Sequence, residues 1–316
     1  MEQKKIAVVI PSYKVKNFIL PVIAGIGAEV SKIYVIDDEC PEETGKWVAA
    51  KVNDPRVVVL YNSENLGVGG ATMVGYQRAL EDGMDIVVKL DGDGQMDPAL
   101  LPNFVKPILA GKADYVKGNR FFHLHSLSKM PLSRIIGNAV LSFVTKMSSG
   151  YWNIFDPTNG YTAIHRIALQ QLPMPEISKR FFFESDILYH LNLIKAVVSD
   201  VQMKAIYGTE TSNLEFARNI GPFAKGHVRN MCRRIFYTYY LRNFNIASIE
   251  LLLGSILLLF GLVFGISEWL KSDATGVAAS AGTVMLSAMP IIIGLQMLLS
   301  FLNYDTQSVP KTPLCE

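Results

Sequence analysis

Two aspartates separated by one residue are the clearest chemical signal in this sequence of 316 residues. Asp91 and Asp93 belong to the run Asp-Gly-Asp-Gly-Gln, which directly follows an apolar, strand-like segment. Two carboxylates placed this way can hold one divalent cation, and Mg²⁺ is usually bound through one or two carboxylates together with substrate phosphates. The glycines let the backbone and a bulky phosphate approach closely. The competing interpretation is a glycine-rich turn whose aspartates are solvated.

Two other ligand-binding motifs fit this sequence less well. An EF-hand loop that began at Asp91 would need Gly at its sixth position and Glu at its twelfth, where this sequence has Met96 and Pro102. The glycine-rich run 65–72 resembles a dinucleotide-binding loop, but Thr72 occupies its third glycine position. That run also follows the third predicted strand rather than the first. A metal and diphosphate site at the aspartates remains the favoured interpretation.

Alternating strand-like and helix-like segments would position these aspartates. Strands are predicted at 4–13, 32–37, 56–61, 85–90 and 115–119. Helices are predicted for the apolar stretch up to Val30 and at 42–52, 67–81, 133–147 and 183–193. This alternation indicates an α/β domain with a largely parallel sheet. Ligands of such sheets bind beyond the carboxyl ends of the strands, where the two aspartates are expected to lie.

The segment 216–249 contains no acidic residue, and its basic residues alternate with aromatic ones. Basic charge and aromatic rings directly before an apolar run are typical of a helix that lies in the lipid headgroup layer. We therefore assign 216–245 to interfacial helices. A solvated basic face on a soluble helix is the alternative.

Two uncharged runs follow this segment. The first, 251–266, reaches about the 20 residues needed to cross hydrocarbon when it is extended back to Ile246. The second is 274–304, and the connector 267–273 is too short for a domain. We therefore predict two transmembrane helices within 246–304.

Segments rich in Lys and Arg next to a membrane span usually lie on the cytoplasmic side, so the basic segment is predicted to be cytoplasmic. No signal-peptide pattern precedes the first strand, so the domain at 1–215 is expected to be cytosolic. The tail at 305–316 would return to the same side. The expected location is thus the cytoplasmic (inner) membrane, as a multi-pass protein with both termini and the catalytic domain cytosolic.

Composition excludes several other classes of protein. The net charge of +2 is too small to indicate nucleic-acid binding. The three cysteines, Cys40, Cys232 and Cys315, have the spacing of neither a zinc site nor a disulfide framework. The oligomeric state stays open, with a homo-oligomer as one alternative.

Seven short motifs, in this order, resemble glycosyltransferase family 2, and within it the polyprenyl-phosphate sugar synthases of the dolichol-phosphate mannose synthase type. The motifs are 10–13, 35–38, 65–67, 91–95, 118–120, 156–161 and 183–184. They cover about residues 5–215, and the resemblance implies the GT-A fold of nucleotide-diphospho-sugar transferases. The two C-terminal spans resemble the membrane hairpin of bacterial members.

The resemblance also implies roles for individual residues. The nucleotide-sugar would be bound by Pro11, Tyr13, Asp37 and Asn65. Mg²⁺ or Mn²⁺ would be held against the diphosphate by Asp91, Asp93 and Gln95. The phosphate of the acceptor lipid would be gripped by Arg120, Arg134 and Asn138. Asp156 and Glu184 fall in the acceptor half, and the residues expected to be catalytic are Asp93, Asp156, Arg120 and Arg134.

Three positions depart from the family pattern. The first motif usually continues Tyr-Asn-Glu, whereas Lys14 and Val15 follow Tyr13 here, so the identity of the base stays open. Thr162 stands where an arginine is usual, with Arg166 nearby. The arginine of the acceptor loop is also absent, and the substitutes that the sequence offers are Lys204, Arg218 and Lys225.

The expected reaction is an inverting, metal-dependent transfer of a sugar from a nucleotide-sugar to a polyprenyl (undecaprenyl or dolichyl) phosphate. A phosphate monoester is mainly dianionic at pH 7, so this nucleophile needs little help from a general base. Two alternatives remain: transfer to a hydroxyl of a lipid-linked saccharide or diacylglycerol, with Asp156 as base, and a non-catalytic membrane scaffold.

Overall fold

The structure is a computed structural model that describes residues 4–121, 132–203 and 216–314, with the backbone alone described at 132–134 and 216–219. The chain divides into two compact units. The first contains residues 1–231 together with 310–316, and the second contains residues 232–309. Each unit is described by itself below.

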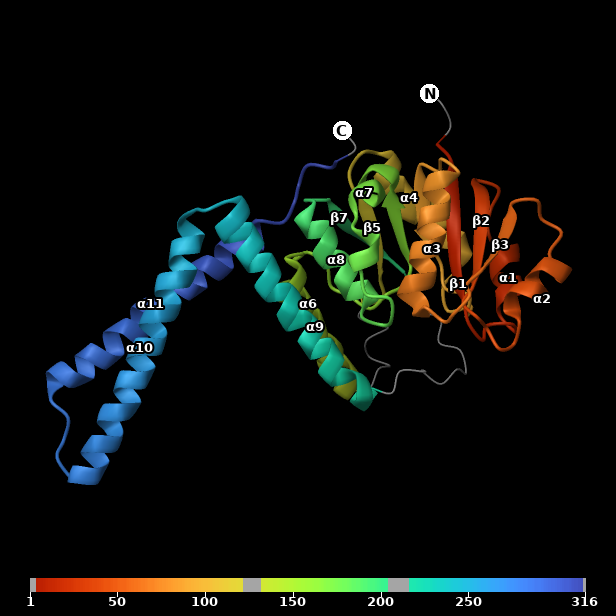
Figure 1. Cartoon of the computed structure of the whole chain (residues 1–316). Helices are drawn as coiled ribbons and strands as arrows, with labels where there is room; N and C mark the ends of the chain where they lie inside the picture. The colour runs from red at the N-terminus through yellow and green to blue at the C-terminus, as the bar shows by residue number, and fades with distance from the viewer. Residues whose placement is uncertain (1–3, 122–131, 204–215, 315–316) are drawn as a thin grey trace. The chain divides into compact units, whose positions relative to one another are not determined.

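A seven-stranded sheet forms the centre of the first unit (Figure 1). Its strands, in chain order, are β1 Ile6–Ser12, β2 Val30–Asp37, β3 Val57–Tyr61, β4 Ile86–Lys89, β5 Tyr115–Asn119, β6 Thr162–His165 and β7 Val198–Gln202. They lie in the order β3-β2-β1-β4-β6-β5-β7, and only β6 runs antiparallel to its neighbours. The predicted α/β class with a largely parallel sheet is therefore confirmed.

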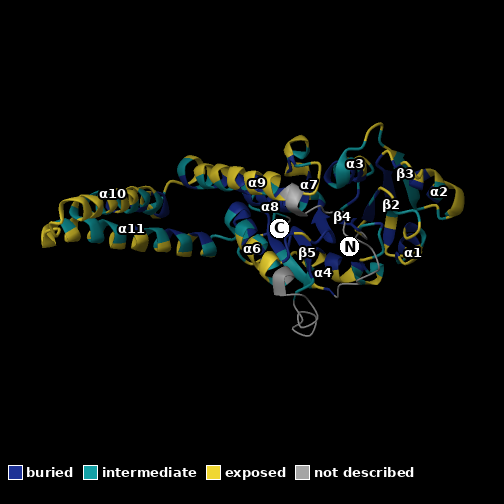
Figure 2. Ribbon diagram, turned by 90° about the horizontal axis from the view of Figure 1, so that it is seen from below, coloured by how far each residue is buried: buried dark blue, intermediate teal, exposed yellow. Residues whose placement is uncertain are grey.

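Helices cover both faces of the sheet. In chain order they are α1 Ile19–Ala24, α2 Thr44–Lys51, α3 Gly67–Glu81, α4 Leu101–Leu109, α6 Leu132–Ser149, α7 Arg166–Gln171 and α8 Phe183–Leu193, with short 3₁₀ turns at Pro98–Leu100 and Met174–Glu176. The apolar side chains of α1 and α4 join alternate residues of β1, β2 and β4 in one buried core cluster. The other face of β1 lies against α3. The two elements approach so closely there that a Cβ atom on Gly75 would collide with the side chain of Val9. Figure 2 shows that buried residues are concentrated in the sheet.

The strands β6 and β7 are missing from the sequence prediction. β6 is only four residues long, and β7 carries polar residues at three of its five positions (Ser199, Asp200 and Gln202), so neither has the continuous apolar run of β1 or β2. The helix expected up to Val30 is also much shorter, because α1 ends at Ala24. Pro11 lies inside β1 rather than at its end.

The second unit is a helical hairpin. α9, Phe216–Phe236, crosses the boundary between the units and continues into a π-helical turn, Tyr237–Arg242. α10, Ile246–Thr275, and α11, Ala281–Gln307, are both long and apolar enough to cross a membrane. Most of their residues are exposed (Figure 2), which indicates membrane association. The connector predicted at 267–273 is wrong, since α10 runs through it and the turn follows at 276–280.

The two long helices approach each other closely at glycines. A Cβ atom on Gly294 would lie 2.7 Å from the backbone nitrogen of Leu258 and 2.8 Å from the carbonyl oxygen of Gly254. Small residues of this kind let the backbones of membrane helices pack closely. At the end of α11, buried Asp305 accepts hydrogen bonds from Arg234 (2.6 and 3.0 Å) and from the hydroxyl of Tyr239 (2.6 Å).

The tail that follows α11, from Pro310 onward, belongs to the first unit. The backbone N–H of Leu314 donates to both carboxylate oxygens of Asp114, at 2.9 and 3.0 Å. Asp114 is fully buried and also accepts from the backbone N–H of Val197 (2.8 Å). The chain therefore passes between the two units twice, once within α9 and once after Val309.

Deleting residues 310–316 is expected to destabilise the protein. The deletion leaves the buried carboxylate of Asp114 without the N–H of Leu314, at a cost of about 1–3 kcal/mol. For a unit of this size each kcal/mol corresponds to roughly 2–4 °C in the melting temperature. Thermal unfolding of the full chain and of the deletion variant in detergent measures this difference. Lys311→Ala, at an exposed tail position, is the control, and equal melting temperatures for all three proteins would contradict the expectation.

Candidate active site

The predicted metal-binding aspartates lie just after β4, at the carboxyl edge of the sheet. The side chains of Asp91 and Asp93 are both partly exposed, and Gln95 is exposed. The backbone N–H of Gln95 donates to Asp93 Oδ1 (2.9 Å), which closes the turn around Gly94, whose φ is +76°. Only glycine adopts such a φ readily. The turn thus presents two carboxylates at one edge, as the sequence predicts.

A buried lysine holds the first of these carboxylates. Lys89, the last residue of β4, donates to Asp91 Oδ1 (2.7 Å) and to the carbonyl oxygen of Gly160 (3.2 Å). Its ammonium nitrogen also lies 3.5 Å from Glu184 Oε1 in the first turn of α8. The Lys89 side chain has no exposed surface. The ammonium group of Lys89 therefore contacts both Asp91, predicted to lie on the donor side, and Glu184, predicted to lie on the acceptor side.

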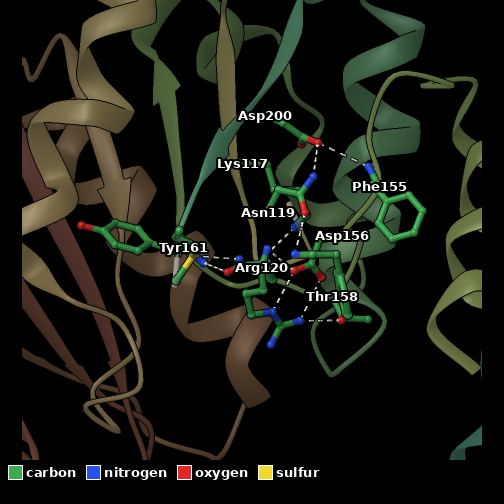
Figure 3. Close-up of polar contacts among 11 residues, drawn as sticks. Lys117, Asn119, Arg120, Phe155, Asp156, Thr158, Tyr161 and Asp200 are labelled. Atoms are coloured by element: carbon green, nitrogen blue, oxygen red, sulfur yellow. Dashed lines mark hydrogen bonds and ion pairs between the residues drawn. The ribbon is translucent and has the colours of Figure 1, made fainter. Parts of the chain in front are cut away.

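Arg120 and Asp156 form a second ion pair beyond the end of β5 (Figure 3). Arg120 donates from Nε to Asp156 Oδ2 (2.7 Å) and from Nη2 to Asp156 Oδ1 (2.9 Å), and its backbone N–H also reaches Oδ2 (3.1 Å). Nη2 donates to Thr158 Oγ1 as well (3.1 Å). Asp156 is completely buried, whereas 27% of the Arg120 side chain is exposed. Asp156 thus fixes the guanidinium and leaves part of it accessible.

The loop 156–160 is held from below by a second buried lysine. Lys117 in β5 donates to the carbonyl oxygen of Asn159, and the Asn159 side chain accepts from the backbone N–H of Tyr161 (3.0 Å) (Figure 3). Gly118 N donates to the carbonyl oxygen of Tyr161 (2.9 Å). The loop that carries Asp156 is therefore tied to β5 at several points.

Burial and charge act in opposite directions on these groups. Burial alone would lower the pKa of Lys89, but Asp91 and Glu184 outweigh it, so the pKa lies above its ordinary value. Burial lowers the pKa of Lys117 to about 8, against the opposing effect of Glu184 and Asp156. Burial also raises the pKa of Glu184, although both lysines oppose that shift. In this site the buried ammonium groups of Lys89 and Lys117 lie among carboxylates of opposite charge.

The residues predicted to bind the nucleoside gather at the same edge. Pro11 lies near the end of β1, next to β2, whose last residue is Asp37. Tyr13 follows β1 and is 44% exposed. The carboxylate of Asp37 accepts from the backbone N–H groups of Cys40 (2.8 Å) and Gly45 (2.5 Å), so it holds the loop that leads into α2.

The neighbouring Asp38, to which the sequence assigned no role, organises the loop before α3. Its carboxylate accepts from the backbone N–H groups of Leu66 (2.9 Å) and Gly67 (2.7 Å). The side chain of Asn65 donates to the carbonyl oxygen of Asp38 (3.2 Å). Asn65 therefore lies beside the end of β2, and its role in binding the nucleotide-sugar stays a prediction.

The predicted phosphate-binding residues of α6 are only partly described. Asn138 is half-buried on this helix. The side chain of Arg134 lies outside the described residues, as do those of Lys204 and Arg218. The grouping of Arg134 and Asn138 with Arg120 stays a prediction.

Lys89 and Lys117 are the residues that sequence reasoning missed. A lysine within or directly after an apolar strand is usually interpreted as the exposed end of that strand. The apolar residues around each lysine in the sequence could have revealed its burial. A lysine in a strand that is covered on both faces of the sheet must be paired with an opposite charge.

Gly160→Ala is expected to lower the activity of this site strongly. A Cβ atom there would lie 2.6 Å from Lys89 Nζ and in contact with Asp91 Oδ2, so the ion pair would have to move. Overpacking of this kind typically costs about 1–3 kcal/mol. Transfer rate and melting temperature are measured together. Gly137→Ala on α6, where a Cβ meets nothing within 4 Å, is the stability control, and full activity of Gly160→Ala would contradict the described packing.

Comparison with known proteins supports this description. Residues 7–172 match the family model described as glycosyl transferase family 2. A UDP-N-acetylglucosamine–dolichyl-phosphate N-acetylglucosaminyltransferase of Methanococcus voltae is 30% identical over 221 residues, which are 66% of this chain and 88% of that protein. An undecaprenyl-phosphate mannosyltransferase of Micrococcus luteus is 32% identical over 161 residues, 50% of this chain and 65% of that protein.

Solved structures show the same fold. Glucosyl-3-phosphoglycerate synthase from Mycobacterium tuberculosis, in complex with Mg²⁺ and UDP, has a TM-score of 0.55 at 19% identity and covers 73% of this chain and 79% of its own. The complex of that synthase with Mn²⁺, UDP and glucosyl-3-phosphoglycerate has a TM-score of 0.54, with 73% and 80% covered. The similarity confirms the GT-A type of fold.

Proposed function

This chain belongs to glycosyltransferase family 2, and we propose that it transfers a sugar from a nucleotide-sugar to a polyprenyl phosphate at the cytoplasmic face of a membrane. The observation that carries the proposal is the arrangement at the sheet edge. Lys89 joins Asp91, the neighbour of Asp93, to the carbonyl of Gly160, and Gly160 ends the loop 156–160 whose first residue, Asp156, pairs with Arg120. One set of groups suits a diphosphate with its cation, and the other suits an anionic acceptor.

The donor side fits a divalent cation by its chemistry. Asp91 and Asp93 offer carboxylate oxygens in one turn, with Gln95 beside them. No group of three or more His, Cys, Asp or Glu side chains suited to a metal occurs within the described part of the chain. A divalent cation bound by Asp91 and Asp93 would complete its coordination with phosphate and water oxygens, as Mg²⁺ commonly does. Mg²⁺ or Mn²⁺ would neutralise the charge that develops on the departing nucleoside diphosphate.

The acceptor side is built around Arg120. A guanidinium that a carboxylate holds in place can bind a phosphate in a fixed orientation, and 27% of the Arg120 side chain is exposed. Arg134 and Asn138, on α6, are proposed to complete this grip. The relatives named above are transferases for dolichyl phosphate and undecaprenyl phosphate, which supports a polyprenyl phosphate as the acceptor.

The proposed reaction is a single displacement that inverts the anomeric carbon. The dianionic phosphate oxygen of the lipid attacks, the bond from the anomeric carbon to the diphosphate breaks, and the diphosphate carries away the bond electrons. No general base is needed, since the phosphate is mainly dianionic at pH 7. Both carboxylate oxygens of Asp156 accept from Arg120, which favours a positioning role over the base role considered from the sequence.

The helices α10 and α11 are proposed to span the membrane twice, with the catalytic unit and the tail on the cytosolic side. We propose 1–215 as the catalytic domain, 216–245 as interfacial helices, 246–304 as the spans and 305–316 as the tail. An enzyme with a polyprenyl substrate must act at the bilayer, because each CH₂ drawn into water costs about 0.8 kcal/mol.

The proposal is tested by incubating membranes that contain the protein with a panel of labelled nucleotide-sugars and undecaprenyl phosphate. Label should enter an acid-labile lipid only when the protein, one nucleotide-sugar and Mg²⁺ or Mn²⁺ are all present. The labelled lipid is extracted, and the sugar attached to it is identified. Label found in diacylglycerol or in a lipid-linked saccharide, with none on the polyprenyl phosphate, would replace the proposed acceptor. Absence of label from every lipid would reject the proposal.

A further inference from the structure

A polar row crosses the sheet beneath the site. Lys89 pairs with Thr162 between β4 and β6, Thr162 pairs with Lys117 between β6 and β5, and Lys117 pairs with Asp200 between β5 and β7. Residues directly opposite one another in neighbouring strands lie on the same face of a sheet. Two lysines without exposed surface therefore lie on the same face of the sheet, one on each side of Thr162, and Lys89 faces Glu184 of α8.

Such burial is costly unless the charges are matched. Removing an ammonium from water costs several kcal/mol, which is offset only by close, well-placed partners. An ammonium has three donors. For Lys89, the carboxylate of Asp91, the carbonyl of Gly160 and the carboxylate of Glu184 supply oxygens at 2.7, 3.2 and 3.5 Å. These partners come from the turn after β4, the loop before β6 and α8.

The two lysines differ in what they touch. Lys117 donates to the carbonyl of Asn159, one residue from the carbonyl that Lys89 contacts. Lys89 alone also contacts the carboxylate of Asp91. Both lysines hold the loop of Asp156, but only Lys89 joins that loop to the turn proposed to hold the cation.

We propose that Lys89 is a positioning residue that couples the donor half of the site to the acceptor half. Its ammonium group holds Asp91 by Oδ1 and so fixes the position of the other carboxylate oxygen, Oδ2. It also holds the loop 156–160, which carries Asp156, the partner of Arg120. The inference rests on the proposed function, since it assigns Asp91 to the cation and Arg120 to the acceptor. Without Lys89, the carboxylates of Asp91 and Glu184 face each other as like charges, and both groups move apart.

Lys89→Met tests this coupling, with Lys117→Met as the matched control. Both changes remove a buried ammonium beneath the same loop, and only the first removes the partner of Asp91. Lys89→Met is expected to raise the Mn²⁺ concentration for half-maximal transfer by at least about tenfold, the equivalent of 1.4 kcal/mol, and to lower kcat. Lys117→Met is expected to lower kcat while leaving the Mn²⁺ requirement within about twofold, because Lys117 donates to the carbonyl of Asn159, whereas Lys89 donates to Asp91.

A second variant guards against loss of the fold. Lys89→Met combined with Glu184→Gln removes both charges of the Lys89–Glu184 pair, so no unmatched charge remains at Glu184, the more buried of the two carboxylates that contact Lys89. The double variant is expected to melt close to the wild type and still to need at least about ten times more Mn²⁺. Binding of Mn²⁺ is followed by electron paramagnetic resonance with UDP or GDP, whichever the wild type binds, so the readout does not depend on an acceptor.

The outcomes separate the inference from the proposed function. A folded Lys89 variant that binds Mn²⁺ as the wild type does would overturn the coupling role and leave the proposed function intact. An increase of the Mn²⁺ requirement equal in Lys117→Met and Lys89→Met would also overturn it, since the effect would then be general to the loop. A wild-type protein that binds no Mn²⁺ with either nucleotide would overturn the proposed donor site, and this inference with it.

Discussion

Asp93→Asn is expected to lower the rate of sugar transfer by at least about 10³-fold, equivalent to about 4 kcal/mol in the activation barrier. The change keeps the shape of the side chain but removes the negative charge that the proposed cation site needs. Asn can still accept the hydrogen bond from the N–H of Gln95 that closes the turn, so the fold should survive. The transfer assay, run over a range of Mg²⁺ and Mn²⁺ concentrations, measures the loss, and chelation should inactivate the wild type to a similar extent.

Asp97→Asn is the matched control for this prediction. Asp97 lies in the same segment, but its carboxylate caps the short helix Pro98–Leu100 by accepting from the N–H of Ala99 (2.9 Å). Asn caps a helix about as well as Asp, so activity should change little. Undiminished transfer by Asp93→Asn in the presence of a chelator would remove the cation from the mechanism.

Arg120→Lys is expected to lower kcat/KM for the lipid acceptor by roughly 10- to 100-fold, the loss of one charge-assisted hydrogen bond of about 1.5–3 kcal/mol. An ammonium keeps the charge but cannot bridge both oxygens of Asp156 in the manner of the guanidinium fork. The KM for the nucleotide-sugar should change much less, because Asp156 and Thr158, which accept hydrogen bonds from the Arg120 guanidinium, are not assigned to the donor. Initial rates at varied acceptor and varied donor concentrations separate the two effects.

Thr158→Val provides the comparison for Arg120→Lys. This change removes only the hydroxyl that accepts from Arg120 Nη2 at 3.1 Å and leaves the pair with Asp156 in place. Its effect should be several-fold smaller. If Arg120→Lys raised the KM for donor and acceptor equally, the assignment of Arg120 to the acceptor side would be wrong.

The apolar strands were predictable because their burial leaves a continuous pattern. β1, β2 and β4 have buried residues at nearly every position, and each was found within a few residues. β6 was not found, because Thr162 and His165 interrupt a strand of only four residues. Its existence depends on pairing with β4 and β5, which are distant in the sequence, and local patterns carry no information about such pairing.

The site was predictable to a similar degree. Asp91 and Asp93 were predicted from two carboxylates after a strand, whereas Arg120 and Asp156 were predicted from the resemblance to the family. The pairing of Arg120 with Asp156, and so the positioning role of that carboxylate, required the tertiary structure. The same holds for Lys89, whose three partners lie in three different elements.

The tail clasped by Asp114 affects the order in which the enzyme matures. Domains near the N-terminus usually fold first as the ribosome makes the chain. Here Leu314, which completes the bonding of a buried carboxylate at the start of β5, is translated after both membrane helices. The sheet can assemble early, but its final hydrogen bonds wait until the hairpin has left the ribosome. With α10 and α11 spanning the membrane as proposed, their insertion is a step in completing the first unit as well as in anchoring it.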